Sequence, residues 1–357
     1  MFGRLYAGEL KKILRPKSII ALSVTLIILL LGYAVLYNLV KTISDTITQS
    51  ITSGDLPEEY QYDESDTEIN KDNIDLWIEV YEEQLKGQED SYENATMGYS
   101  YYASVFSTKA KISALKFMRD NNLYDINVLG LNASVGGLMS DLTAEGFAKT
   151  YMSAVTLVIA IYGIVVGAGL LADEYRNGTI KLLLTRPITK NQLITAKLLS
   201  TLTVCFAFMS LFTLIGYVYG LIAFKNIATE SVYLVFNAKS LVKSTMGAVV
   251  FGEYVVSLVR IAAMVLIAYF LGTVSRKKTT GIIVTIIIQV NIISSILGLL
   301  PVQIGLLTPN LGLMSYFDAS ASVPTYGNFF ISLAVDIVYM AAVTFGLYFT
   351  VNKRDVI

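Results

Sequence analysis

Long stretches of apolar sequence without charge constrain this chain more than any other feature. Runs such as 18–38 and 279–300 approach or exceed the ~20 residues that a helix needs to cross the hydrocarbon core of a bilayer. Across the whole chain, 54% of residues are hydrophobic and 15% are charged. We therefore predict an all-α polytopic membrane protein and not a soluble domain.

Six membrane-spanning helices are predicted, and the charges between them set their direction. Cytoplasmic segments of membrane proteins are enriched in Lys and Arg, a rule that applies to short connections and not to long translocated domains. The short segments assigned to the inside carry 5, 5, 3 and 2 cations, against 3 and 0 in the short outer loops. The prediction is a multi-pass protein of the plasma membrane with both termini in the cytoplasm. The predicted spans are residues 18–40, 151–171, 198–224, 254–274, 279–300 and 328–350, the third beginning as a helix near Lys190.

The first 17 residues have apolar and basic residues interleaved at roughly helical spacing. That pattern is typical of a helix lying in the membrane interface. A signal peptide is the competing interpretation, but run 18–38 is longer than the ~7–15 residues of a signal core. We therefore predict an interfacial helix at 1–17 followed by a retained first span.

Residues 41–150 differ in composition from the rest of the chain. They hold 20 of the 28 acidic residues and 8 basic ones. Apolar residues at helical spacing predict two helices, at 67–86, which contains Trp77, and at 98–121. We expect 41–150 to form a small, acidic, helical domain outside the cell.

The basic segment 172–197, between the second and third predicted spans, carries signals for two turns with a short helix between them. Gly178 suits the left-handed residue that ends a helix, and Thr179 is suited to cap the next one. Pro187 stops that helix, because the residue before a proline is pushed out of helical geometry. Thr189 and Gln192 have the spacing of a capping box that opens the following span. The predicted short helix, 179–185, carries an apolar group at the membrane surface: Ile180, Leu182, Leu183 and Leu184.

This segment resembles the corresponding loop of type-2 ABC exporter permeases, whose coupling helix contacts the ATPase subunit. The competing interpretation is an ordinary basic loop between two spans. By the resemblance, Ile180, Leu183 and Leu184 are expected to contact the ATPase, with Glu174 and Arg176 flanking the turn. The positions that match the family pattern are Glu174, Gly178, Thr179, Leu182, Leu183, Arg186, Pro187, Ile188 and Lys197.

The resemblance also implies partners. Such permeases act in pairs, so a homodimer or a heterodimer with a related permease is expected, together with ATPase subunits that bind ATP and Mg. The expected cargo is amphipathic or hydrophobic: a peptide, a lipid or a drug. Membrane lipid is the surrounding medium, and no nucleic acid is expected as a partner.

Catalytic chemistry within this chain is poorly supported. No G-x-x-x-x-G-K-[ST] phosphate loop occurs, so ATP hydrolysis by that machinery is excluded. Histidine is absent, which removes the commonest general base and the commonest zinc ligand. The one cysteine, Cys205, lies in an apolar run and offers no disulfide framework. We predict no catalytic residues, no metal site and no cofactor in this chain.

Polar residues within the spans are candidates for the translocation path, because they are costly in lipid and tend to face protein or water. Thr285 and Gln289 share one face of the fifth predicted span, with Asn291 close by. In the family the second and fifth spans line the central cavity, which adds Thr156 and Tyr162. The alternative is an interhelical hydrogen bond without cargo contact.

Two intramembrane charges are predicted to pair. Arg260 in the fourth span and Asp336 in the sixth lie at similar depths below the outer ends of their helices. Alternatively, Arg260 extends outward to Glu253 or to the lipid headgroups. On the second span, Gly163 and Gly167 have the spacing that permits close helix approach, which serves either a dimer contact or packing within the chain.

Two functions from other classes remain open at this stage. An ion-coupled secondary transporter would need a coupling-ion site, for which Glu253, Arg260 and Asp336 are the candidate charges. A membrane sensor would use the acidic outer domain to bind a signal. Transport that an ionophore dissipates would favour the first, and signalling without transport would favour the second.

Overall fold

The structure is a computed structural model that describes residues 2–52, 71–92, 99–122, 143–180, 188–224, 231–237, 240–290, 312–317 and 328–353. Within these ranges, five helices are long and apolar enough to cross a membrane. The multi-pass helical architecture predicted from the apolar runs is thus confirmed. The five helices are α2 (Pro16–Thr52, with its apolar part at Pro16–Leu39), α5 (Ala144–Arg176), α7 (Lys190–Phe224), α8 (Met246–Ser275) and α12 (Phe329–Lys353).

The predicted fifth span is seen only in part. Helix α9 (Lys278–Gln289) has 12 residues and covers the first half of the predicted run 279–300. Residues from 291 onward in that run lie outside the described residues. A count of six spans therefore stays a prediction.

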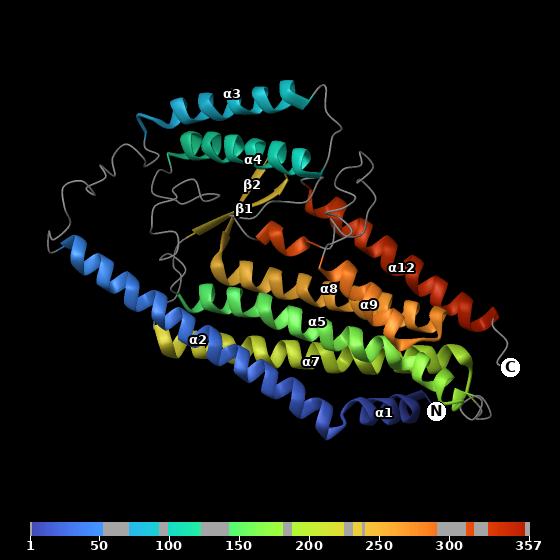
Figure 1. The fold of residues 1–357 in the computed structure, drawn as a ribbon. Helices are drawn as coiled ribbons and strands as arrows, with labels where there is room; N and C mark the ends of the chain where they lie inside the picture. Colours follow the sequence, from blue (N-terminus) through green and yellow to red (C-terminus); the bar gives the residue numbers. More distant parts are fainter. Residues whose placement is uncertain are drawn as a thin grey trace.

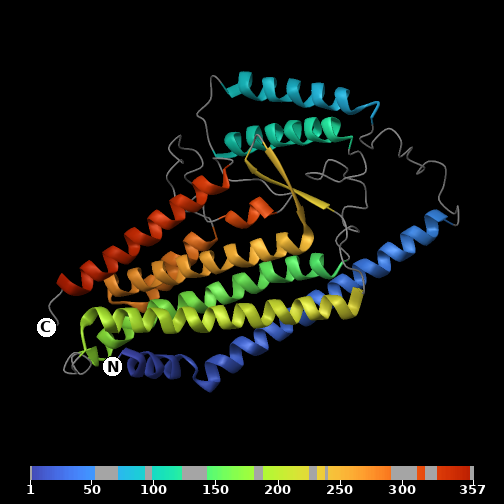
Figure 2. The same cartoon turned by 180° about the vertical axis from the view of Figure 1, so that it is seen from behind.

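Helix α5 is the centre of the bundle. It packs against α8 and α7 most extensively, and also against α9 and α2 (Figures 1 and 2). A Cβ on Gly163 would lie 2.7 Å from the side chain of Val265, and one on Gly167 would lie 3.0 Å from its carbonyl oxygen. The close approach predicted for these glycines is therefore used inside the chain, between α5 and α8, and not at a dimer contact.

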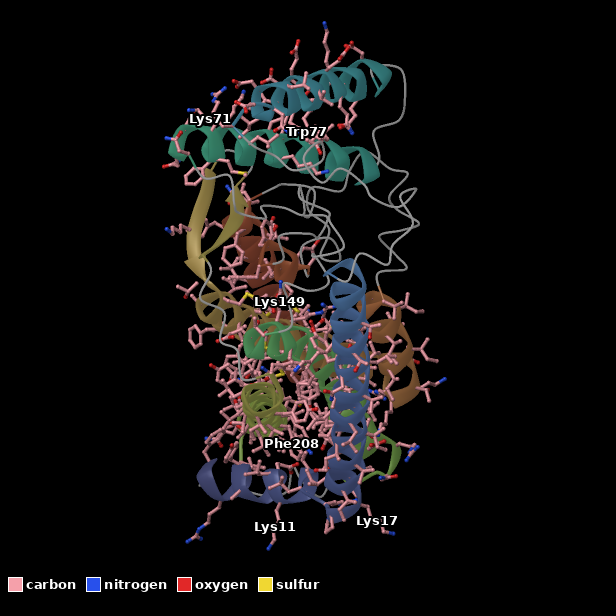
Figure 3. The ribbon with its side chains drawn as sticks, turned by 90° about the vertical axis from the view of Figure 1, so that its left-hand side faces the viewer. Lys11, Lys17, Lys71, Trp77, Lys149 and Phe208 are labelled. Atoms are coloured by element: carbon pink, nitrogen blue, oxygen red, sulfur yellow. The ribbon has the colours of Figure 1, made fainter. Side chains whose placement is uncertain are left out.

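Helix α1 (Phe2–Ile13) lies against α7 at the end of the bundle where α5 ends and α7 begins (Figure 1). It stops before Pro16, which opens α2, because proline disfavours helical geometry in the preceding residue and is tolerated at a first helical position. Lys11 and Lys17 point away from the bundle (Figure 3). A helix thus covers most of 1–17, and its place in the membrane interface stays a prediction.

Helices α3 (Ile74–Tyr92) and α4 (Tyr99–Asn121) lie side by side beyond the bundle, in the segment predicted as a helical domain (Figures 1 and 2). Helix α3 begins seven residues later than the predicted 67–86. Buried apolar side chains join the two helices, and three exposed ion pairs flank them. The buried set includes Ile74, Ile78, Ile112, Leu115 and Met118, and the pairs are Arg119–Asp75, Lys116–Glu82 and Lys109–Glu89.

A β-hairpin lies in the predicted outer loop 225–243 and amends the all-α prediction. Strand β1 (Ser231–Asn237) pairs antiparallel with β2 (Ser240–Thr245), from Ser231 opposite Thr245 to Asn237 opposite Ser240. The sequence of β1, SVYLVFN, is rich in β-branched and aromatic residues, which favour strands. The strand was not predicted because its seven residues are too few for a membrane-spanning run.

Several helices extend beyond their apolar runs at the end of the bundle that is predicted to lie outside. Helix α2 continues to Thr52, α5 begins at Ala144 and α8 begins at Met246, capped by the Thr245 hydroxyl. Polar residues can continue a helix, whereas hydropathy detects only the part that suits lipid. A 3-10 helix, η4 (Leu313–Phe317), packs on α8, with Phe317 lying against Gly252.

Candidate functional site

The turn that follows α5 has the predicted geometry. Asn177 caps α5, and its N–H donates to the carbonyl of Asp173. Gly178 follows with φ of +69°, the left-handed region that favours glycine. A Cβ at this position would meet nothing within 4 Å, so the backbone angle and not space requires the glycine.

Thr179 bonds back to the helix that precedes it. Its hydroxyl donates to the side-chain carboxylate of Glu174 and lies 3.4 Å from the backbone carbonyl of the same residue. The helix that Thr179 was predicted to cap lies outside the described residues, so that cap stays a prediction. The first residues of the loop are joined to α5 by this bond.

Ile180 is turned inward. Its side chain is buried in an apolar cluster that includes Leu171, Leu193 and Tyr269. Ile180 was expected on a surface for the ATPase, but it packs inside its own chain because it follows directly on a turn that folds back over α5. Arg176, in contrast, is exposed. The remaining expected contact residues, Leu183, Leu184, Arg186 and Pro187, lie outside the described residues, as does Leu182.

The start of α7 has the predicted capping box. The Gln192 N–H donates to the Thr189 hydroxyl over 3.2 Å, and the Thr189 N–H donates to the Gln192 side-chain carbonyl over 3.3 Å. These reciprocal bonds satisfy two of the N–H groups that lack partners at a helix N-terminus. Both ends of segment 172–197 are therefore held in defined geometry.

Four charged side chains meet at the base of this loop, and we call them the Lys197 cluster: Glu9, Lys12, Glu174 and Lys197. The Lys197 ammonium donates to Glu9 Oε2 over 3.0 Å and to Glu174 Oε1 over 3.2 Å. Lys12 lies 2.9 Å from Glu9 Oε1 and 3.6 Å from Glu174 Oε1. The side chain of Lys197 is 3% exposed and that of Glu9 is 6% exposed. Two carboxylates and two ammonium groups give the cluster no net charge.

Sequence reasoning missed the contribution of α1 to this cluster. Lys197 and Glu174 were both singled out by the resemblance, but their contact across 23 residues was not predicted. Glu9 is the one acidic residue in the basic segment 1–17, and that exception was the available signal. The residue next to Glu174 was also missed: Asp173 lies 3.7 Å from Lys278 at the start of α9. In the last turn of α5, Asp173 thus contacts α9, whereas the adjacent Glu174 contacts α7 and α1.

The predicted path residues fall on two sides of α5. The Thr156 hydroxyl bonds its own helix at the Met152 carbonyl and lies near Met209 of α7, and Tyr162 accepts a bond from Ser18 of α2. Thr285 bonds its own helix at the carbonyl of Gly281. Gly281 packs against α5 and α8, so the face of α9 that it shares with Thr285 and Gln289 is turned the same way.

Gln289 is 4% exposed, and within the described ranges neither its side-chain nitrogen nor its oxygen has a hydrogen-bond partner. The structure therefore brings Thr285 and Gln289 together on one face of α9 but separates them from Thr156 and Tyr162. Asn291 lies outside the described residues.

Arg260 and Asp336 lie on α8 and α12, which pack together. Asp336 is 1% exposed. Arg260 Nε and Asp336 Oδ1 are both buried without a hydrogen-bond partner. In the part of the chain that is described, no ion pair joins these two side chains within 4.0 Å. Their pairing stays a prediction.

A metal centre is not formed in the described ranges: no group of three or more Cys, Asp or Glu side chains gathers there in a way that could hold a metal ion. The sequence model of a protein family described as ABC-2 family transporter protein matches residues 4–350. Neither a curated protein nor a solved structure matches the chain.

Proposed function

The chain belongs to the ABC-2 family of transporter membrane proteins, and from this premise we propose the transport cycle in which it acts. As a permease membrane subunit, it lacks ATPase activity itself. It moves an amphipathic or hydrophobic cargo, of the peptide, lipid or drug class, across the plasma membrane. The energy comes from ATP hydrolysed with Mg by a separate ATPase subunit.

One observation carries the proposal: the defined geometry at both ends of segment 172–197. A rigid base is needed if a loop is to transmit a displacement into the spans and not absorb it. The left-handed Gly178, the Thr179–Glu174 bond and the Thr189–Gln192 capping box supply that base. We assign ATPase contact to Leu183, Leu184 and Arg186, together with the exposed Arg176, and assign Ile180 to internal support.

A second permease subunit is part of the proposal. Most of α5 is buried, yet Leu157, Ile161 and Val165 form an exposed apolar stripe at four-residue spacing along it. A stripe of this kind on the central helix fits a second copy of the chain or a related permease better than lipid alone. The interface would place the central helices of both subunits beside the cargo path.

For the path itself, we retain Thr285 and Gln289. Among the described residues, the side-chain amide of Gln289 on α9 has no hydrogen-bond partner, so it can form hydrogen bonds with a polar part of the cargo. Thr156 and Tyr162 already have hydrogen-bond contacts on the other side of α5. Helix α1 and the last turn of α12 lie at the bundle end that also holds the end of α5 and the start of α7 (Figure 1). This arrangement supports a topology with both termini in the cytoplasm.

An ion-coupled secondary transporter is the alternative function. The observation that favours it is the pair of charged residues Arg260 and Asp336, each with a buried side-chain atom that lacks a hydrogen-bond partner among the described residues. Transport by reconstituted chain without an ATPase subunit, abolished by an ionophore, would establish this alternative and remove the exporter.

The experiment that tests the proposed function is Leu183→Asp. A carboxylate in an apolar contact is costly to desolvate, so the variant should lose the ATPase subunit on co-purification or hydrolyse ATP without transport. Asn177→Asp is the matched control, because it adds the same charge at an exposed position of the same loop and should change neither property. Unchanged co-purification and transport in Leu183→Asp would exclude the loop from coupling.

A further inference from the structure

The Lys197 cluster joins three segments that are distant in the sequence. Glu9 comes from α1, Glu174 from the last turn of α5 and Lys197 from the second turn of α7. A buried ammonium is costly unless it is paired and hydrogen-bonded, and Lys197 has two carboxylate partners within 3.2 Å. Its position is therefore dictated by both carboxylates at once.

The cluster extends directly into the loop. Glu174 accepts a bond from Thr179, which follows Gly178, so the first residues after α5 are bonded to a member of the cluster. On the other side, Glu9 also binds Lys12 of its own helix. A continuous chain of charged bonds thus leads from α1 to the turn.

We propose that the Lys197 cluster is a latch, in which Glu9 and Lys197 are positioning residues that make α1 move together with the base of segment 172–197. The inference rests on the proposed function for its consequence: a displacement of the loop by the ATPase carries the interfacial helix with it. Without the latch, α1 is held to α7 by apolar contacts and by the bond from the Tyr6 hydroxyl to Thr203, which is 2.8 Å long.

Variants that differ in charge balance distinguish loss of the link between α1 and the loop from a general loss of stability. Lys197→Met leaves two carboxylates facing one ammonium group, so it removes the link and unbalances the site. Glu174→Gln combined with Lys197→Met removes every ion pair from α1 to α5 and α7 and leaves Glu9 and Lys12, 2.9 Å apart within α1, as a balanced pair. The double variant should regain most of the lost thermal stability, yet α1 should stay uncoupled from the loop.

The test is a distance measurement by pulsed electron spin resonance on the full chain in lipid nanodiscs. Spin labels replace Lys11 on α1 and Asn177 in the turn, both of which are exposed; the native Cys205 is buried and unreactive. We expect a narrow distance distribution in the parent chain and a broad one in the double variant. Tyr6→Phe is the control: it removes the bond from α1 to α7, spares the cluster and should keep the distribution narrow.

A functional arm follows with the ATPase subunit present. The parent chain should keep the same distance in the nucleotide-free and ATP-bound states. Transport per ATP should fall at least about fivefold in the double variant, the lower end of a typical coupling between two sites. Equal distributions in the parent chain and the double variant would overturn the latch. Because that first arm uses the permease alone, its result stands even if no ATPase subunit binds.

Discussion

Two buried polar regions of this permease differ in how their charges are satisfied. In the Lys197 cluster every charged side chain has an opposite partner within 3.6 Å. In the second set, Arg260, Asp336 and Gln289 each have at least one buried side-chain atom that has no hydrogen-bond partner among the described residues. We call these three residues the unpartnered polar groups.

The difference teaches what each region contributes. A satisfied network holds its elements in one arrangement, whereas an unsatisfied buried polar group costs free energy and needs a separate reason to be present. Within a membrane, such groups commonly mark a substrate or ion pathway. We therefore associate the Lys197 cluster with mechanical connection and propose a role in cargo binding for the unpartnered polar groups.

The largest effect is expected from Lys197→Met. Removing one partner of a buried ion pair costs about 3–5 kcal/mol, because an uncompensated charge stays behind. Here Glu9 and Glu174 would be left close together with Lys12 alone to balance them. Thermal unfolding in detergent measures the loss, and Lys11→Met is the control at an exposed position of α1. An equal effect of both variants would show that the cluster contributes no specific stability.

A smaller loss is expected from Asp336→Leu. If the carboxylate compensates Arg260, its removal leaves the arginine alone, which costs about 2.5–3.5 kcal/mol on membrane-insertion scales. Adding Arg260→Leu should then restore much of the stability. Thermal unfolding of the single and double variants forms the test. A double variant as damaged as the sum of the two single variants would show that the charges do not interact.

The smallest stability effect is expected from Gln289→Leu. Its amide has no partner to lose, and an apolar side chain removes a desolvation cost of roughly 1–3 kcal/mol, so stability should be unchanged or higher. Transport should fall if the amide binds cargo. Thr156→Val is the matched control, since the Thr156 hydroxyl is buried and bonded within its own helix, apart from the face of α9 assigned to the path. Destabilisation by Gln289→Leu would contradict the distinction between the two regions.

Local sequence signals predicted the turn and cap geometry well. The left-handed Gly178 and the Thr189–Gln192 capping box are confirmed because each depends on residues within four positions of one another. The surface position predicted for Ile180 was wrong because it depends on residues far away in the sequence. Whether an apolar side chain on a short segment faces inward or outward depends on which helices lie beneath it, and no local pattern contains that information.

The sequence by itself determined that this chain is a multi-pass helical membrane protein. In lipid, the backbone N–H and C=O groups of a long apolar run must be hydrogen-bonded to one another, and a helix does this within one segment. The basic residues between the runs mark the predicted cytoplasmic side. Tertiary structure alone decided which polar groups meet. Glu9 and Lys197 are 188 residues apart, and Gln289 lacks a partner, because helix packing around α5 sets their neighbours. Such contacts depend on the relative rotation and depth of helices, which the order of residues along each helix does not specify.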